Sequence, residues 1–167
     1  MKRIKVINDP SDLVPMLMAL DTQVKRDVFN EVTRDWCTIK QIEQKYGKDG
    51  KSALQFFERM KLVETMWQTK EANKQEKAYH TYYMSFHINT SAPVNEIIDV
   101  LSVAVMSDKE YEKIENKIYE MTTDQGEFAG NIIEKLKFSN TMLKSLVRRS
   151  DRLELRGHRI ERLKDIT

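Results

Sequence analysis

Residues 38–64, TIKQIEQKYGKDGKSALQFFERMKLVE, constrain the fold of this chain more than any other stretch. The pattern is typical of two short helices joined by a tight turn, with a strand starting at the end. Thr38 can cap the first helix through its hydroxyl, and Gly47 can adopt the left-handed conformation that ends a helix. Asp49 can cap a second helix over residues 49–61, in which apolar residues recur at helical spacing.

The second helix of this pair leaves a polar and basic face outside its apolar one. We expect this face to bind DNA through Lys48, Lys51, Ser52, Gln55 and Arg59. Amide and basic side chains can bind base edges in a major groove, and short polar or basic side chains can bind phosphates. The alternative is a plain helical hairpin with a solvated face. Phe56, at the edge of the face, is the one apolar residue that we expect to be exposed there.

The hydrophobic period changes after Leu62. Residues 63–69 (VETMWQT) and 79–88 (YHTYYMSFHI) alternate as strands do, and the polar segment between them carries Lys70, Lys74 and Lys77. A helix–turn–helix followed directly by a β-hairpin is the winged-helix arrangement. In that arrangement the hairpin lies over the DNA backbone, so we expect these three lysines to contact phosphates.

A second, smaller copy of this organisation is predicted over residues 125–167. A short helix (GEFAGNIIEKL) and a helix capped by Ser139 (NTMLKSLVRRS) precede a hairpin (LELRGHRIERL) that turns at Gly157-His158. Residues 135–164 carry a net charge of +7 and the rest of the chain −5, which favours a polyanionic partner for this part. Its candidate DNA-binding residues are Asn140, Thr141, Lys144, Arg148, Arg149, Arg156, His158 and Arg159. Alternatively, this second winged-helix-like domain serves in assembly.

Two helices are predicted over residues 93–124, between a domain at 1–92 and one at 125–167. The first is apolar almost all round, so it should be buried on more than one side. Either it is the central core helix of one monomer, or a dimer seam runs through Ile97, Ile98, Leu101 and Val105. The fold class is mainly α with small β-hairpins.

The composition excludes several classes of protein. Hydrophobic content of 40% with 32% charged residues is typical of a globular chain, and no apolar stretch is long enough to span a membrane. Cys37 is the only cysteine, which favours a reducing, cytoplasmic location. The chain has no phosphate-binding glycine loop, no HExxH and no nucleophile elbow, so we expect no enzyme, cofactor or catalytic residues.

The chain also resembles a known family. The runs LMALDTQVKRDVFNEV, TIKQIEQKYG, KSALQFFERMKLVE and KAYHTYYMSFHIN resemble ArsR-type winged-helix repressors of archaea over residues 10–90. The most specific piece is the L-x-x-F-x-x-x-x-L-V run from Leu54 to Val63. The resemblance implies a homodimer that binds operator DNA and represses transcription. It places dimer contacts on the first helix, at Leu13, Met16 and Leu17, and on a helix after the wing.

Metal-sensing members of that family carry a Cys-x-Cys pair at the recognition helices, which this chain lacks, so no metal is expected. The sequence therefore predicts a homodimeric DNA-binding transcriptional regulator, a repressor that reads the major groove of double-stranded DNA with helix 49–61. The alternative is a non-enzymatic assembly scaffold built from tandem winged helices, as in chromosome-partitioning or basal transcription complexes.

Overall fold

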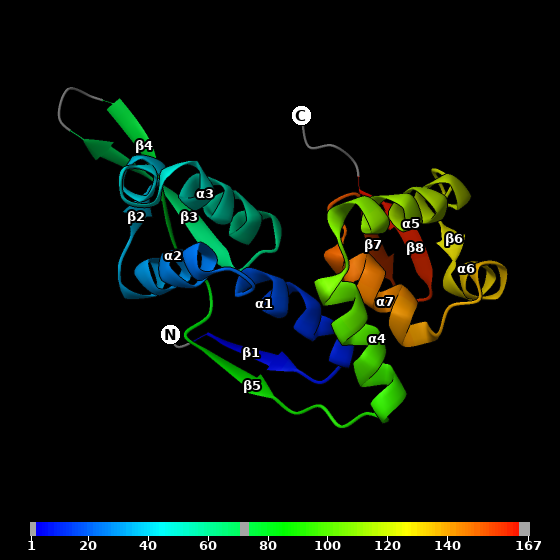
Figure 1. Ribbon diagram of the computed structural model, residues 1–167. Helices are drawn as coiled ribbons and strands as arrows, with labels where there is room; N and C mark the ends of the chain where they lie inside the picture. Colours follow the sequence, from blue (N-terminus) through cyan, green and yellow to red (C-terminus); the bar gives the residue numbers. More distant parts are fainter. Residues whose placement is uncertain (1–2, 71–73, 164–167) are drawn as a thin grey trace. The chain divides into compact units, whose positions relative to one another are not determined.

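The computed structural model describes residues 3–70 and 74–163, which form two compact units (Figure 1). The first unit comprises the described residues up to Val6 together with residues 17–88. The second comprises residues 7–16 together with the described residues from Asn89 onward. Each unit is therefore built from two separate segments of the chain.

The first unit is a helix–turn–helix framed by strands. Its main elements are α2 (Gln23–Arg34), β2 (Cys37–Thr38), α3 (Ile39–Arg59), β3 (Val63–Lys70) and β4 (Lys74–Thr81). The strands form an antiparallel sheet in the order β2-β4-β3. This arrangement is the predicted winged helix, in which β3 and β4 form the wing.

Gly47 divides α3 into two helical segments. Its φ of 66° is positive, as predicted, but its ψ of −156° is extended, a combination that glycine almost alone adopts. The first segment begins with a capping box, in which the Thr38 hydroxyl accepts from the Gln41 N–H and the Gln41 side chain accepts from the Thr38 N–H. The second segment runs over residues 48–59, two residues shorter than predicted at its end, because Lys61 has a positive φ of 57° and turns the chain into β3.

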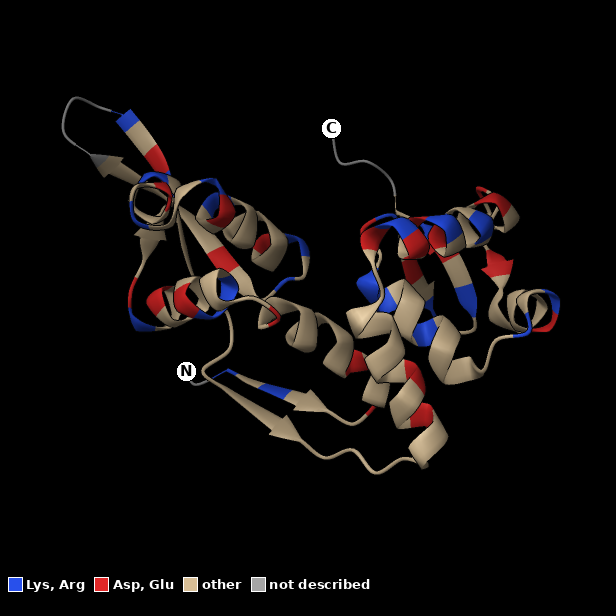
Figure 2. Ribbon diagram, viewed as in Figure 1, with Lys and Arg blue, Asp and Glu red and all other residues tan. Residues whose placement is uncertain are grey.

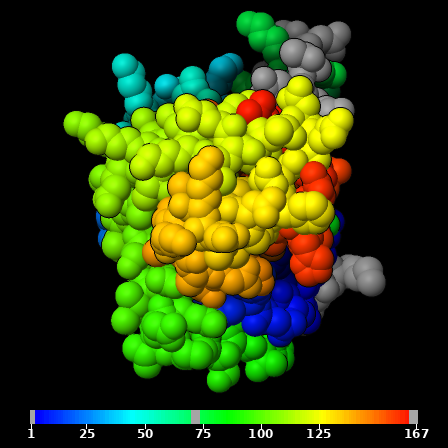
Figure 3. Space-filling view, turned by 90° about the vertical axis from the view of Figure 1, so that its right-hand side faces the viewer, coloured from blue at the N-terminus to red at the C-terminus, as the bar shows by residue number. Residues whose placement is uncertain are grey.

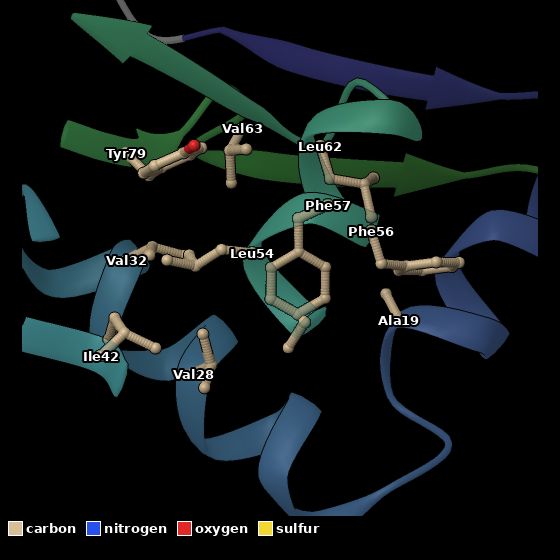
Figure 4. Packing of buried hydrophobic residues seen from close by; sticks show 11 residues of the cluster. Ala19, Val28, Val32, Ile42, Leu54, Phe56, Phe57, Leu62, Val63 and Tyr79 are labelled. Atoms are coloured by element: carbon tan, nitrogen blue, oxygen red, sulfur yellow. The ribbon is translucent and has the colours of Figure 1, made fainter. Parts of the chain in front are cut away.

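The core of the first unit fixes the orientation of this second segment. Leu54 and Phe57 of α3 are fully buried against Val28 and Val32 of α2, and Tyr79 of β4 is buried in the same cluster (Figure 4). Burial of each such aliphatic or Phe side chain contributes roughly 1.5–3 kcal/mol. The face of α3 opposite these residues is thereby held outward.

The wing differs from the predicted hairpin at both ends. The strand expected over residues 79–88 is split, since β4 ends at Thr81 and β5 (Ser85–Ile88) pairs instead with β1 (Ile4–Ile7) in a separate two-stranded sheet. At the break, the Thr81 hydroxyl donates to the Tyr83 carbonyl over 3.0 Å, which closes a local turn. Lys70, Lys74 and Lys77, expected in the connection, lie in β3 and β4.

The second unit contains the same order of elements. It is made of α4 (Val94–Val105), α5 (Asp108–Met121), β6 (Glu127–Phe128), α6 (Ala129–Leu136), α7 (Asn140–Arg149), β7 (Leu153–Arg156) and β8 (Arg159–Arg162). A short strand, two helices and a hairpin follow one another as in the first unit. The strand order β6-β8-β7 also repeats the order β2-β4-β3, and Leu155 lies opposite Ile160 as predicted.

Residues 7–16 pack into the second unit although they lie far from its other residues in sequence. They contain the 3-10 helix η1 (Pro10–Asp12) and the start of α1 (Leu13–Ala19). Ile7 and Val14 are fully buried. The Asp9 carboxylate accepts from the backbone N–H and the hydroxyl of Ser11, which caps η1.

Candidate nucleic-acid interface

The second segment of α3 presents the predicted polar face. Lys48, Ser52, Gln55 and Arg59 are exposed, and Lys51 is half-buried. Except for the adjacent residues 51 and 52, successive members of this set are three or four positions from one another. They therefore share one side of the helix. Donors and acceptors are thus gathered on one ridge that the buried Leu54 and Phe57 support from below.

Phe56 does not interrupt this ridge. We expected its ring to be exposed, but it is only 7% exposed and belongs to the core cluster. The Lys25 ammonium lies 4.4 Å from the ring centroid, and the Arg59 guanidinium lies 5.6 Å from it. Cations that cover an aromatic ring at such distances keep water from it. The ridge is therefore polar throughout.

The wing lysines differ from one another. Lys74 is exposed on β4, whereas Lys77 is half-buried and ion-paired with Glu58 on the second segment of α3. The side chain of Lys70 lies outside the part of the structure that is described. Of the two lysine side chains that are described, that of Lys74 is the better placed to meet a phosphate, and Lys77 links the wing to α3.

Trp67 is a surface residue that the sequence reasoning did not select. It lies in the middle of β3, opposite Lys77 of β4, and 67% of it is exposed. The alternating pattern of VETMWQT indicated a strand but did not show that the strand runs beyond the core. That extension leaves Trp67 uncovered.

The face of α7 that corresponds to the α3 ridge is largely covered. Thr141, Ser145 and Arg149 are buried, although we expected Thr141 and Arg149 to contact DNA. The Arg149 guanidinium donates to the carbonyls of Val103 and Met106 over 2.8 and 2.7 Å and pairs with Asp108. The Arg149 guanidinium is thus bound to groups inside the second unit, and Thr141 is buried, so this structure leaves neither side chain exposed as the prediction of DNA contact requires.

Two further α7 cations are paired with the acidic residues of the N-terminal segment. Lys144 lies 2.9 Å from Asp9, and Arg148 lies 2.8 Å from Asp12. Burial would raise the pKa of the Asp9 carboxyl, but hydrogen bonds from Ser11 and Lys144 outweigh it and lower that pKa. Figure 3 shows this N-terminal segment, in blue, against the orange of α7.

The remaining DNA-binding candidates of the second unit, apart from Asn140, lie on its hairpin. Arg156 and His158 are exposed, and Arg156 pairs with Glu154 and Glu161 on the same hairpin. Arg159 is half-buried and donates to the carbonyls of Gln125 and Gly126. Asn140, at the start of α7, is exposed. Most of the basic residues in the segment 135–164 are thus paired with acidic or carbonyl groups of the same unit. Figure 2 shows acidic and basic residues interleaved there.

Three of the residues predicted for dimer contact, Ile98, Leu101 and Val105, form an exposed apolar stripe on α4 together with Val94, which was not predicted. Val94, Ile98, Leu101 and Val105 are 76%, 56%, 47% and 81% exposed, and they recur at intervals of four, three and four. This spacing places them in a row along one side of the helix. Ile97 is half-buried. No basic residue lies on α4 (Figure 2). On α1, Leu13 and Met16 are half-buried and Leu17 is exposed.

Metal ligands, a reactive thiol and membrane-spanning helices are the other features that bear on function. Among residues 3–70 and 74–163, no three His, Cys, Asp or Glu side chains come together as metal ligands would. Burial, followed by the charges of Glu31 and Asp35, raises the pKa of the Cys37 thiol, which lowers its reactivity. Within the same residues, no helix has the length and apolar character that crossing a membrane requires.

Comparison with known proteins agrees with the winged helix. A search of curated proteins found no match to this chain. A family model described as ArsR transcriptional regulator matches residues 7–164, which include nearly all of both units. The chain therefore belongs to the ArsR family of transcriptional regulators.

Proposed function

We propose that this protein is a homodimeric repressor that reads operator DNA in the major groove with residues 48–59 of α3. The observation that carries the proposal is the exposed ridge of basic, hydroxyl and amide side chains on a helix locked by its core. Lys51, Ser52 and Gln55 meet base edges, since their donors and acceptors suit the major groove. Arg59 and Lys74 meet phosphates on either side.

The dimer is formed through the apolar stripe of α4. A soluble surface rarely carries a row of four such exposed aliphatic side chains, because each costs free energy in contact with water. A second copy of the same stripe would cover it. In the dimer, the two recognition segments bind half-sites about 34 Å apart, one turn of the double helix. Bound at a promoter in the cytoplasm, such a dimer blocks transcription.

The second unit acts as a second winged-helix-like domain that supports assembly instead of reading DNA. Its topology supports the winged-helix part of this proposal. The pairing of Lys144 and Arg148 with internal carboxylates supports the assembly part. The same observation favours a second candidate function for the whole chain, a protein-assembly scaffold in which the winged helices bind protein.

A selection from a library of random DNA duplexes, followed by titration of the selected site, tests the proposal. We expect one sequence to be enriched, with an affinity that falls steeply as salt rises. Gln55→Ala should cost about 1–3 kcal/mol at one base pair and relax the preference there. Lys74→Ala should weaken all duplexes alike and reduce the salt slope by about one.

Two results would count against the proposal. Enrichment of no sequence, together with binding that salt does not weaken, would remove the DNA-reading role and favour the scaffold. If Gln55→Ala kept the wild-type base preference at every position of the site, the assignment of base reading to this ridge would be wrong. Thr33→Ala, an exposed change on α2, provides a control outside the ridge.

A further inference from the structure

Trp67 is a large exposed aromatic residue on the wing. Single exposed apolar residues are common on protein surfaces, but Trp67 is 67% exposed and leaves a larger apolar area in contact with water than most of them do. It lies on the wing, whose edge strand is β3 in the order β2-β4-β3. The strand to which it belongs is therefore open to a partner along one side.

The strand register shows which face of the wing carries Trp67. Trp67 lies opposite Lys77, and Thr65 lies opposite Tyr79. Side chains two apart on a strand share a face, so Trp67 and Thr65 lie on the face that buries Tyr79 in the core against α3. On this face Lys77 pairs with Glu58 of the recognition segment. Trp67 therefore stands on the side of the wing that adjoins the DNA-reading ridge.

The neighbours of Trp67 have the chemistry of a backbone-binding surface. Thr65 and Thr69 flank it on the same face of β3, and both are exposed. A DNA strand alternates apolar deoxyribose with anionic phosphate. An indole ring can cover the sugar while its N–H and the two hydroxyls donate to phosphate oxygens. A flat ring between two donors suits that alternation.

We propose that Trp67 packs against deoxyribose of the DNA strand that borders the major groove read by α3, with Thr65 and Thr69 donating to the adjacent phosphates. This contact rests on the proposed DNA-binding function and extends it to the wing. It supplies affinity without charge, unlike the contact of Lys74. Sequence preference still comes from the α3 ridge.

The first test uses the two tryptophans of the chain. In Trp36→Phe, Trp67 is the only indole; Trp36 itself is half-buried and stacked on His80, where Phe keeps a ring. The variant is titrated with a short mixed-sequence duplex whose label reports binding independently. We expect Trp67 emission to change in proportion to the duplex bound, and quenching by acrylamide to fall at saturation. Unchanged emission and quenching while the label reports binding would overturn the proposal.

The second test compares Trp67→Ala with Met66→Ala. Met66 is the neighbouring exposed residue of β3, but it lies on the opposite face of the sheet. We expect Trp67→Ala to weaken binding of the same duplex about tenfold with an unchanged salt slope, because no charge is lost. Met66→Ala should bind as the wild type does. Denaturation curves of both variants check that the fold is intact.

The outcomes separate this proposal from the one on which it rests. Wild-type binding that Trp67→Ala leaves unchanged overturns the Trp67 contact and leaves the function of the α3 ridge standing. Absence of duplex binding by the wild type at low salt overturns both. Self-association that is lost only in Trp67→Ala, with DNA affinity unchanged, assigns Trp67 to a protein contact and overturns the DNA contact.

Discussion

Gly50 permits the close approach of the two segments of α3. A Cβ built at this position would lie 2.6 Å from the Tyr46 Cβ and 2.9 Å from the Ile42 Cγ2. Both contacts are shorter than real carbon–carbon contacts, and the Tyr46 atom is fixed to the backbone. The angle at which the recognition segment leaves the turn therefore depends on the missing side chain of Gly50.

We expect Gly50→Ala to lower the free energy of unfolding by about 1–3 kcal/mol, because the added methyl group overpacks the turn. Urea denaturation followed by circular dichroism measures the change. Gly130→Ala is the matched control, since its Cβ would meet nothing within 4 Å on helix α6. That change should leave stability equal or raise it by up to about 1 kcal/mol. Similar losses in both variants would contradict the packing argument.

Tyr79 couples the stability of the fold to alkaline pH. Burial, with the charge of Glu58 added, raises the pKa of Tyr79 from 10.0 to about 12. Between these values the unfolded chain has released the proton and the folded chain still holds it. The unfolded state binds fewer protons there, so the free energy of unfolding falls as pH rises.

We accordingly expect a lower urea midpoint near pH 11 than near pH 9. Tyr79→Phe removes the ionisable group, so its loss of stability over the same interval should be smaller. Burial also raises the pKa of Tyr111 in the second unit, which leaves a residual pH dependence in the variant. An identical loss in Tyr79→Phe and wild type would show that Tyr79 does not titrate in this way.

At the scale of elements, α3 and α7 occupy equivalent places in their units but differ in what covers them. The α3 ridge is exposed, whereas the outer face of α7 is covered by α4 and by the segment that holds Asp9 and Asp12. The carboxylates of Asp9 and Asp12 pair with Lys144 and Arg148, two cations that could otherwise pair with phosphates. Removing these carboxylates should therefore free two cations.

We expect Asp9→Asn combined with Asp12→Asn to raise affinity for mixed-sequence duplex and to steepen the salt slope by up to about two. Fluorescence anisotropy at several salt concentrations measures both. Glu112→Gln with Glu120→Gln makes the same change in net charge at exposed positions of α5. If the control pair raises affinity and slope equally, net charge and not release of Lys144 and Arg148 explains the effect.

Periodicity and capping predicted most elements of both units, because these signals are local. The break at Gly47, the caps at Thr38 and Ser139 and the pairing of Leu155 with Ile160 were all readable from the chain. The surroundings of a side chain could not be predicted from the sequence, since they depend on segments that are distant along the chain. Arg149 was assigned to DNA because nothing near it in sequence reveals the Val103 and Met106 carbonyls that it binds.

The same limit applies to the candidate interface. The ridge of α3 was predicted because its residues and its apolar support lie on one helix. Burial of Phe56 under Lys25, and exposure of Trp67, depend on how α2 and the wing pack and how far β3 runs beyond the core. The assignment of individual residues to base or phosphate contacts stays a prediction.

At the scale of the whole molecule, the proposed dimer depends on the apolar stripe of α4. Ile98→Glu places a charge in the middle of the stripe, where a second copy would have to bury it at a large cost. We expect this variant to sediment as a monomer under conditions in which the wild type is a dimer, and to lose binding to a two-half-site operator.

Asn95→Glu is the control for this variant. It adds the same charge to an exposed residue of α4 that does not belong to the stripe. It should dimerise as the wild type does. Dimerisation of Ile98→Glu with wild-type affinity would place the seam elsewhere on the molecule.

The path of the chain has a consequence for how the protein is made. The chain passes between the units after residues 6, 16 and 88, so neither unit is a single stretch of sequence. The first unit has all its residues once position 88 has left the ribosome. The segment that holds Ile7 and Val14 is translated among the first, but α4 and α7, against which η1 packs, are synthesised much later. A nascent chain therefore carries an unpaired apolar segment for most of its synthesis, and a gene cut after position 88 would leave that segment permanently without its partners.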